Sequence, residues 1–158
     1  MAEFSHLDSE NNPSMVDVGA KTVTRRTATA QSIVVLTDEI MQQMSGGDIQ
    51  TKKGAVFQTA LIAGTMAAKR TSDLIPLCHP LGLDSCKFSF RTEGKEVIIE
   101  CTTSLEAKTG VEMEALVGAS VAALTVYDMC KAFSHDLVIR ETRLLEKTGG
   151  KRDVQRHG

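Results

Sequence analysis

Aromatic side chains are scarce in this 158-residue chain, which has five Phe, one Tyr and no Trp. A protein that binds single-stranded nucleic acid needs aromatic platforms for base stacking, so this class is poorly supported. Basic residues are not in excess either, because Lys plus Arg is 18, Asp plus Glu is 20 and the formal net charge is −2. We therefore expect no nucleic-acid partner, although a local basic pocket remains compatible with this charge.

Long apolar runs and signal sequences are also missing. No run approaches the roughly 18 residues that a membrane span needs. Residues 1–14 lack the basic start and the apolar centre of a signal peptide. The four cysteines are too widely spaced for a zinc knuckle or a redox motif; they are Cys78, Cys86, Cys101 and Cys130. We expect a cytoplasmic protein with reduced thiols, no metal site and no membrane partner.

The length of the chain suits one domain with polar ends. Residues 1–14 are predicted to form a flexible N-terminal arm, and residues 15–146 a single α+β domain. Residues 147–158 contain two adjacent glycines followed by Lys151 and are predicted to form a mobile tail. A hydrophobic fraction of 42% is enough to build a core between these ends.

Residue periodicity predicts the element order β, α, α, β, β, α, β. The predicted strands are Thr22–Leu36, Cys86–Arg91, Val97–Cys101 and Leu137–Leu145, and the predicted helices are residues 37–44, 55–71 and 111–132. This order is typical of a ferredoxin-like α+β fold, with a four-stranded antiparallel sheet and helices packed on one face. Any apolar residues on the other face need a cover, and a partner subunit is the simplest one.

Two loops carry candidate chemistry. Lys53 and Gly54 precede a predicted helix, where a lysine and free backbone N–H groups are suited to holding phosphate. A solvated loop lysine is the alternative. Pro76 and Pro80 enclose His79, whose imidazole exchanges protons near neutral pH. The alternative for His79 is a hydrogen bond to a backbone carbonyl.

The predicted helix 111–132 carries candidates at both ends. Glu112 and Glu114, in its first turn, either favour the positive helix end or accept hydrogen bonds from a purine. Asp128 and Lys131 lie three residues apart near its last turn, hence on one face. They form either a surface ion pair or a lysine steered by a carboxylate, and the apolar residues around them predict a partly enclosed pair.

The length of this helix constrains any shared site. Glu114 and Asp128 are 14 residues apart, which is about 21 Å along a helix. One small ligand does not reach both ends within one chain. Either the ligand is long, or one helix end serves a neighbouring chain's site, which favours an oligomer with a site at a subunit boundary.

Several short sequence motifs follow one another along the chain. They are residues 15–18 (MVDV), 53–54 (KG), 68–71 (AKRT), 73–80 (DLIPLCHP), 108–116 (KTGVEMEAL), 119–125 (ASVAALT), 127–132 (YDMCKA) and 149–151 (GGK). Together they resemble the cyclic pyranopterin monophosphate synthase family, the molybdenum cofactor biosynthesis protein C family, over about residues 15–151. The one departure noted is Ala55, where members often have Asp.

The resemblance implies a ferredoxin-like lyase of molybdopterin biosynthesis that needs no cofactor. It would convert 3′,8-cyclo-7,8-dihydro-GTP to cyclic pyranopterin monophosphate and pyrophosphate. It would be a homohexamer, a trimer of dimers with active sites at the dimer interface. Carried over by motif, the catalytic residues would be Lys53, His79, Asp128 and Lys131. The residues in or near the substrate pocket would be Arg26, Lys69, Leu77, Cys78, Glu112, Met113, Glu114, Lys147 and Lys151.

The residues themselves fit such a reaction. A triphosphate needs a local basic pocket, and the residues predicted to supply it are Lys53, Lys69, Arg70, Lys147 and Lys151. The rearrangement needs proton donors and acceptors and stabilisation of phosphate charge, without a redox centre. Two alternatives stay open. One is an RNA-binding domain that stacks bases on Phe88 and Phe90. The other is a small-molecule sensor, which needs a ligand site but no acid–base pair.

Overall fold

The computed structural model describes residues 4–156, so the outermost residues of the predicted arm and tail, 1–3 and 157–158, lie outside the described range. The strands are β1 (Thr24–Val35), β2 (Met44–Ser45), β3 (Asp48–Thr51), β4 (Gly54–Ala55), β5 (Ser85–Glu93), β6 (Glu96–Ala107), β7 (Val138–Thr148) and β8 (Val154–Gln155). The helices are α1 (Asp38–Met41), α2 (Val56–Lys69), α3 (Thr71–Leu74) and α4 (Glu112–Cys130).

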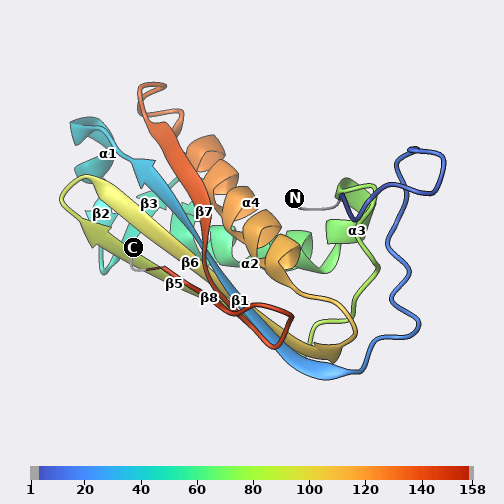
Figure 1. Ribbon diagram of the computed structural model, residues 1–158. Coiled ribbons are helices and arrows are strands. Elements are labelled where there is room, and N and C mark those ends of the chain that lie inside the picture. Colours follow the sequence, from blue (N-terminus) through green and yellow to red (C-terminus); the bar gives the residue numbers. More distant parts are fainter. Residues whose placement is uncertain (1–3, 157–158) are drawn as a thin grey trace.

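The main sheet is antiparallel, with strand order β5-β6-β1-β7-β8, and α2 and α4 pack together against it (Figure 1). The predicted α+β class is confirmed. The predicted count of four strands is wrong, because β8 adds a fifth strand at the edge of β7. Val154 and Gln155 of β8 pair with Lys147 and Glu146. A two-residue strand is too short to show the alternation by which longer strands are recognised.

Small residues let α4 lie close to the centre of the sheet. Ala28 and Ala30 of β1 belong to one buried cluster with Ala115 and Ala119 of α4. A larger aliphatic cluster, which includes Val34, fills the other end of the same interface. Small side chains on both surfaces reduce the distance between helix and strand, so α4 is fixed along its length.

The face of the sheet turned away from the helices is mostly polar. Ile33 of β1 pairs with Ile98 of β6. Ile33 precedes Val34, and Ile98 follows Val97. Because both valines face the core, the two isoleucines point to the opposite face. Both are buried within the chain, at 5% and 4% exposure. Beside them Gln31 is buried as well. The apolar part of this face is therefore covered without a partner chain.

The segment between β1 and α2 departs from the sequence prediction. A helix was expected over residues 37–44, but α1 ends at Met41 and is followed by a three-stranded sheet, β2-β3-β4. Gly46 and Gly47 form the β2–β3 turn with φ values of 61° and 81°, which glycine adopts without strain. Strands of two to four residues leave no periodic signal, so sequence reasoning missed them.

Length and composition alone would allow one described helix, α4, to cross a membrane. The expectation that no segment approaches this length was therefore wrong. Most of α4 is buried between α2 and the sheet, and core helices of soluble proteins meet the same criterion. The four cysteines are free thiols, as predicted.

The contact between α2 and α4 gives a test of the packing. A Cβ atom at Gly64 would lie 2.5 Å from Phe88 Cζ and 2.8 Å from the backbone oxygen of Gly118. We expect Gly64→Ala to lower the free energy of unfolding by about 1–3 kcal/mol in urea denaturation, in spite of alanine's higher helix propensity. Gly82→Ala is the control, since nothing lies within 4 Å of the added atom. Equal stability of the two variants would contradict this packing.

Candidate functional site

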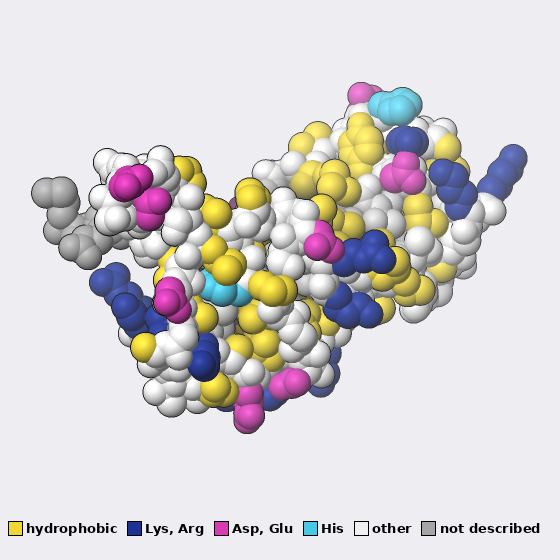
Figure 2. Space-filling model, turned by 90° about the vertical axis from the view of Figure 1, so that its right-hand side faces the viewer, with side chains coloured by type: hydrophobic (Ala, Val, Ile, Leu, Met, Phe, Trp, Pro, Cys, Tyr) yellow, Lys and Arg dark blue, Asp and Glu magenta, His cyan; other side chains and the backbone are white. Residues whose placement is uncertain are grey.

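A cavity of about 640 Å³ lies at the start of α4. Four segments far apart in the sequence meet there, namely the N-terminal segment, the loop after α3, the first turn of α4 and the C-terminal segment. The lining residues are Ser5, His6, Val16, Val18, Lys21, Ile75, Pro76, Leu77, Cys78, His79, Leu81, Thr109, Gly110, Glu112, Met113, Glu114 and Lys151. Figure 2 shows hydrophobic side chains and a histidine in a hollow of the surface.

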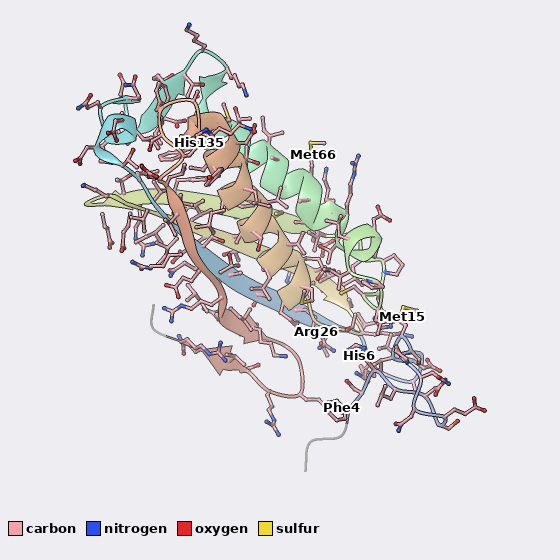
Figure 3. All side chains as sticks on the ribbon, turned by 90° about the horizontal axis from the view of Figure 1, so that it is seen from above. Phe4, His6, Met15, Arg26, Met66 and His135 are labelled. Atoms are coloured by element: carbon pink, nitrogen blue, oxygen red, sulfur yellow. The ribbon has the colours of Figure 1, made fainter. Side chains whose placement is uncertain are left out.

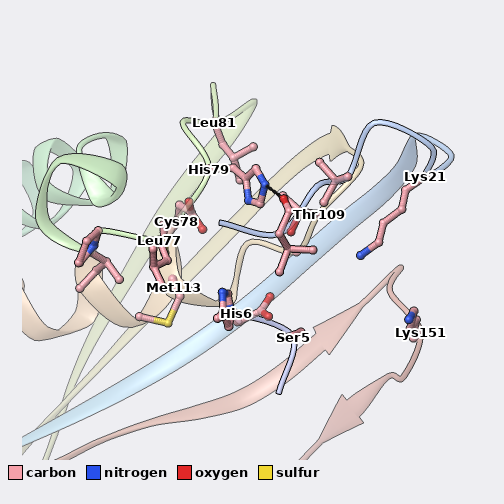
Figure 4. A pocket seen from close by; sticks show the side chains of 17 residues that line it. Ser5, His6, Lys21, Leu77, Cys78, His79, Leu81, Thr109, Met113 and Lys151 are labelled. Atoms are coloured by element: carbon pink, nitrogen blue, oxygen red, sulfur yellow. Dashed lines mark hydrogen bonds between the residues drawn. The ribbon is translucent and has the colours of Figure 1, made fainter. Parts of the chain in front are cut away.

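The loop after α3 is held in place at both ends. The backbone N–H of Ile75 donates to Thr71 O, and that of Cys78 donates to Ile75 O, so the loop starts as a continuation of α3. Farther along, His79 Nε2 lies 2.6 Å from the carbonyl oxygen of Val16 (Figure 4). Because a carbonyl only accepts, Nε2 carries the hydrogen, and in a neutral ring Nδ1 is free to accept a proton.

Two glutamates stand in the first turn of α4. Glu114 is only 4% exposed, and burial raises the pKa of its carboxyl to about 7, with a further contribution from the negative charge of Glu112. Burial also raises the pKa of the Cys78 thiol, as do the charges of Glu114 and Glu112. Near neutral pH the Cys78 thiol is therefore protonated, and Glu114 exchanges a proton.

A smaller cavity of about 180 Å³ shares five lining residues with the first, including Lys21, Glu112 and Lys151. It adds Arg26 and Lys147, so four cationic side chains surround one carboxylate. In Figure 4, Lys21 and Lys151 lie across the pocket from Leu77, Cys78 and Met113. The arrangement gives the site an apolar side for a ring system and a basic side for an anion.

The polar atoms of the smaller cavity are only partly satisfied. Lys147 Nζ lies 3.6 Å from Glu112 Oε1, and Arg26 Nη2 donates to the backbone oxygen of Lys108 at 3.2 Å. Arg26 Nε and Glu112 Oε2 are buried and have no hydrogen-bond partner among residues 4–156. Buried polar groups without partners are costly, so a polar ligand that supplies both a hydrogen-bond acceptor and a donor would stabilise this cavity.

Three other predicted residues meet at the far end of α4. Lys131 Nζ donates to Asp128 Oδ1 at 2.7 Å, and Lys53 Nζ lies 3.9 Å from Asp128 Oδ2. The hydrogen bond from Lys131 lowers the pKa of Asp128, with smaller help from the charge of Lys53, and Asp128 in turn raises the pKa of Lys131. Lys131 is thus a protonated ammonium at neutral pH.

The expectation of a partly enclosed pair was wrong. The Asp128 and Lys131 side chains are 57% and 46% exposed in the chain. Met129 and Cys130, the apolar neighbours that suggested enclosure, point into the core instead. Neighbours in a helix sequence lie on different faces, so their burial says little about the residues beside them.

The predicted site residues therefore form two groups. Figure 3 shows the separation, with His135, just after α4, at one end of the molecule and Arg26 and His6 at the other. Lys53, Asp128 and Lys131 share the His135 end. His79 and most of the predicted pocket residues share the other; these are Arg26, Leu77, Cys78, Glu112, Met113, Glu114, Lys147 and Lys151. Lys69, at the end of α2, lines neither cavity and lies near Cys86.

Sequence reasoning missed several lining residues. They are Ser5, His6, Val16, Val18, Lys21, Ile75, Leu81 and Thr109. The N-terminal ones join the site through the His79–Val16 hydrogen bond, which spans 63 residues of sequence. Lys21 gave no signal beyond being a loop lysine. The block at residues 15–18, part of the family resemblance, was the one available pointer to Val16 and Val18.

The structure also bears on the alternative functions. Phe88 and Phe90 are half-buried against the core, and Phe90 stacks on Phe57 with ring centroids 5.1 Å apart. Their rings are thus used inside the fold, which removes the stacking pair of the RNA-binding interpretation. Among residues 4–156, no three His, Cys, Asp or Glu side chains form a set that would hold a metal ion.

The comparisons with known proteins all indicate one protein family. The MoaC family matches residues 15–150. Cyclic pyranopterin monophosphate synthase from Xanthomonas oryzae pv. oryzae is 53% identical over 154 residues, which cover 97% of this chain and 93% of that protein. The synthase from Staphylococcus carnosus is 51% identical over 154 residues, covering 96% and 94%. A molybdenum cofactor biosynthesis bifunctional protein from Synechocystis is 51% identical over 156 residues, covering 96% of this chain and 45% of that protein.

The raised pKa of Glu114 predicts how stability depends on pH. Between pH 4.5 and about 7 the folded chain binds a proton at Glu114 that the unfolded chain has lost, so stability falls as the pH rises through this window. Glu114→Gln removes the charge, and we expect it to be more stable than the parent by about 3 kcal/mol at pH 8 but not at pH 4. Urea denaturation at both pH values measures this.

The matched control is Glu106→Gln, an exposed glutamate on the preceding strand. It should change stability little at either pH. If the parent and Glu114→Gln show the same pH dependence, Glu114 is not a buried carboxyl with a raised pKa.

Proposed function

Since the chain belongs to the MoaC family, we propose that it is a cyclic pyranopterin monophosphate synthase of molybdenum cofactor biosynthesis. It converts 3′,8-cyclo-7,8-dihydro-GTP to cyclic pyranopterin monophosphate and releases pyrophosphate. The structural observation that carries the proposal is the cavity at the start of α4, which joins an apolar side and two carboxylates to a cluster of four cations.

The two sides of the cavity suit two different parts of the substrate. The triphosphate carries several negative charges and binds on the basic side, where Lys21, Arg26, Lys147 and Lys151 stand. The base-derived ring lies against Leu77, Cys78 and Met113, and its N–H groups donate to Glu112 and Glu114. Lys53 is at the other end of α4, so within one chain it does not join Lys147 and Lys151 on the triphosphate.

Two groups supply the proton transfers. His79, held by the Val16 carbonyl, presents Nδ1 as a proton acceptor. Lys131 is kept protonated by Asp128 and donates a proton, while Lys53 adds positive charge beside the same carboxylate. The positive charges of Lys131 and Lys53 also stabilise the negative charge that develops as pyrophosphate leaves and the cyclic phosphate closes.

A complete site needs both groups, and they lie about 21 Å apart along α4. We propose that they combine across a subunit boundary in a cytoplasmic homohexamer, a trimer of dimers with the active sites at the dimer interface. Exposed apolar side chains on the outer surface of α2 and α4 support an assembly; Ile62, Met66 and Leu124 are 59%, 46% and 57% exposed.

The fold itself is proposed to be ferredoxin-like. The four long strands stand in the order β5-β6-β1-β7, with α2 and α4 as the crossover helices, which is the split βαβ arrangement. Residues 15–146 form the catalytic domain, and the segments before and after it complete the cavity through His6 and Lys151.

The direct test of the activity is incubation of the protein with 3′,8-cyclo-7,8-dihydro-GTP. We expect stoichiometric cyclic pyranopterin monophosphate and pyrophosphate, detected by mass spectrometry and a pyrophosphate assay. GTP is the matched control, because it lacks the 3′,8 bond and should give no pterin. A sensor domain would bind the compound and return it unchanged, and that outcome would refute the proposal.

The role of Lys131 is tested by Lys131→Arg and Lys131→Ala. Arginine keeps the charge but does not readily release a proton, because guanidinium stays protonated far above neutral pH. We expect both variants to lose about 10²–10⁴-fold in kcat, with substrate binding and oligomeric state retained. An active Lys131→Arg enzyme would make Lys131 a phosphate ligand instead of a proton donor.

The shared site is tested by mixing two inactive chains, Asp128→Ala and Glu114→Ala, after dissociation and reassembly. If each site takes one helix end from each of two chains, random mixing restores up to about one quarter of the parent activity. Each variant alone, taken through the same procedure, is the control. Absence of recovery in fully mixed oligomers would place both residues in one chain's site and contradict the shared site.

A further inference from the structure

Lys53 stands on a tightly built turn. It lies between β3 and β4, next to Gly54, whose φ of 112° favours glycine. Thr51 Oγ1 accepts the backbone N–H of Lys53 at 3.1 Å and donates to Gly54 O at 2.9 Å. The backbone of the turn is therefore fixed relative to β3, and the position of Lys53 depends on what holds β3.

The start of α2 lacks a cap of its own. Its N-cap residue is Ala55, which has no side chain able to accept a hydrogen bond. The carboxylate of Asp48, on β3, supplies the cap instead, since Oδ1 accepts from Phe57 N at 2.8 Å and Oδ2 from Gln58 N at 3.3 Å. A carboxylate at this place also interacts favourably with the positive helix end.

The same carboxylate lies close to the end of α4. The pKa of the Cys130 thiol is raised to about 11, chiefly by burial and further by the negative charge of Asp48. Cys130 stands between Asp128 and Lys131 in the sequence. Asp48 thus joins the hairpin that carries Lys53 to the start of α2, and its charge acts on the last turn of α4.

The side-chain contact between Lys53 and Asp128 is weak by itself. Its Nζ lies 3.9 Å from Asp128 Oδ2, and the two side chains are 66% and 57% exposed. An ion pair between exposed groups is too weak to hold a flexible lysine in one place. The fixed element is the backbone of the hairpin, and Asp48 binds that hairpin to α2.

We propose that Asp48 is a positioning residue for the reaction, which caps α2 from β3 and thereby sets Lys53 against the Asp128–Lys131 pair. The inference rests on the proposed function, because it takes Lys53 to act with Asp128 and Lys131. Small displacements of a catalytic group reduce rates strongly, so the loss of this anchor acts on turnover.

The test compares Asp48→Ala in the parent and in a Lys53→Ala background. We expect Asp48→Ala to reduce kcat about 10-fold to 100-fold with a smaller change in KM. In the Lys53→Ala background the same substitution should change kcat less than about twofold, because residues that act through one another are not additive. Asp48→Asn, which keeps Oδ1 for Phe57 N, should recover most of the lost kcat. If Asp48→Ala does not fold, the cycle is run with Asp48→Leu, which keeps the volume of the side chain but has no acceptor, and its loss of kcat must again disappear without Lys53.

Thr37→Ala is the matched control, since Thr37 Oγ1 caps α1 by accepting from Ile40 N, away from Lys53. Thr37→Ala should lower the stability of the fold and leave kcat unchanged. This control separates the loss of a helix cap from the displacement of Lys53. Equal kcat losses from Asp48→Ala in both backgrounds, or an unchanged kcat in the parent, would overturn the inference.

A second readout needs no turnover. Lys53 contributes to the lowered pKa of Asp128, so Asp48→Ala should raise that pKa in the same direction as Lys53→Ala, with no further rise in the double variant. Carboxyl carbon NMR across an acid titration measures it. An unchanged Asp128 pKa in Asp48→Ala overturns the positioning role. If that pKa rises while the parent enzyme makes no pterin, the proposed function fails and the positioning geometry stands.

Discussion

The length of one buried helix governs the arrangement of this protein. α4 has 19 residues, about 28 Å at the usual rise, and carries Glu112 and Glu114 in its first turn and Asp128 near its last. Alanines and a glycine along α4 allow the sheet and α2 to contact it closely, so its two ends are fixed relative to each other. A chemical group at one end does not reach a small ligand bound at the other.

Each end of α4 has its own electrostatic character. At the first turn, burial makes Glu114 easy to protonate, and nearby lysines and Arg26 surround Glu112. At the last turn, Asp128 and Lys131 strengthen each other's charges at an exposed surface. In the proposed function, the first environment binds the triphosphate and the ring system of the substrate, and the second supplies a protonated donor. Acid–base chemistry on a bound nucleotide derivative needs both, which explains why the oligomer belongs to the proposed mechanism.

Much of this was predictable from the sequence where the signal is local. The spacing of apolar residues gave α4, alternation gave β5 and β6, and the three-residue spacing gave the Asp128–Lys131 contact. The missed features depend on short or distant pairings. β2, β3, β4 and β8 are too short for periodicity, and the His79–Val16 hydrogen bond joins residues far apart in the chain. The predicted partial enclosure of Lys131 was wrong because its apolar neighbours face the core.

The most direct measurement is a crystal structure of the Lys131→Ala protein with bound 3′,8-cyclo-7,8-dihydro-GTP. We expect one substrate molecule to contact Glu112, Glu114 and His79 of one chain and Asp128 of a second chain. We also expect the triphosphate to lie beside Lys147 and Lys151 of the first chain. A substrate bound entirely within one chain, with every Asp128 remote from it, would show that the site is not shared between chains.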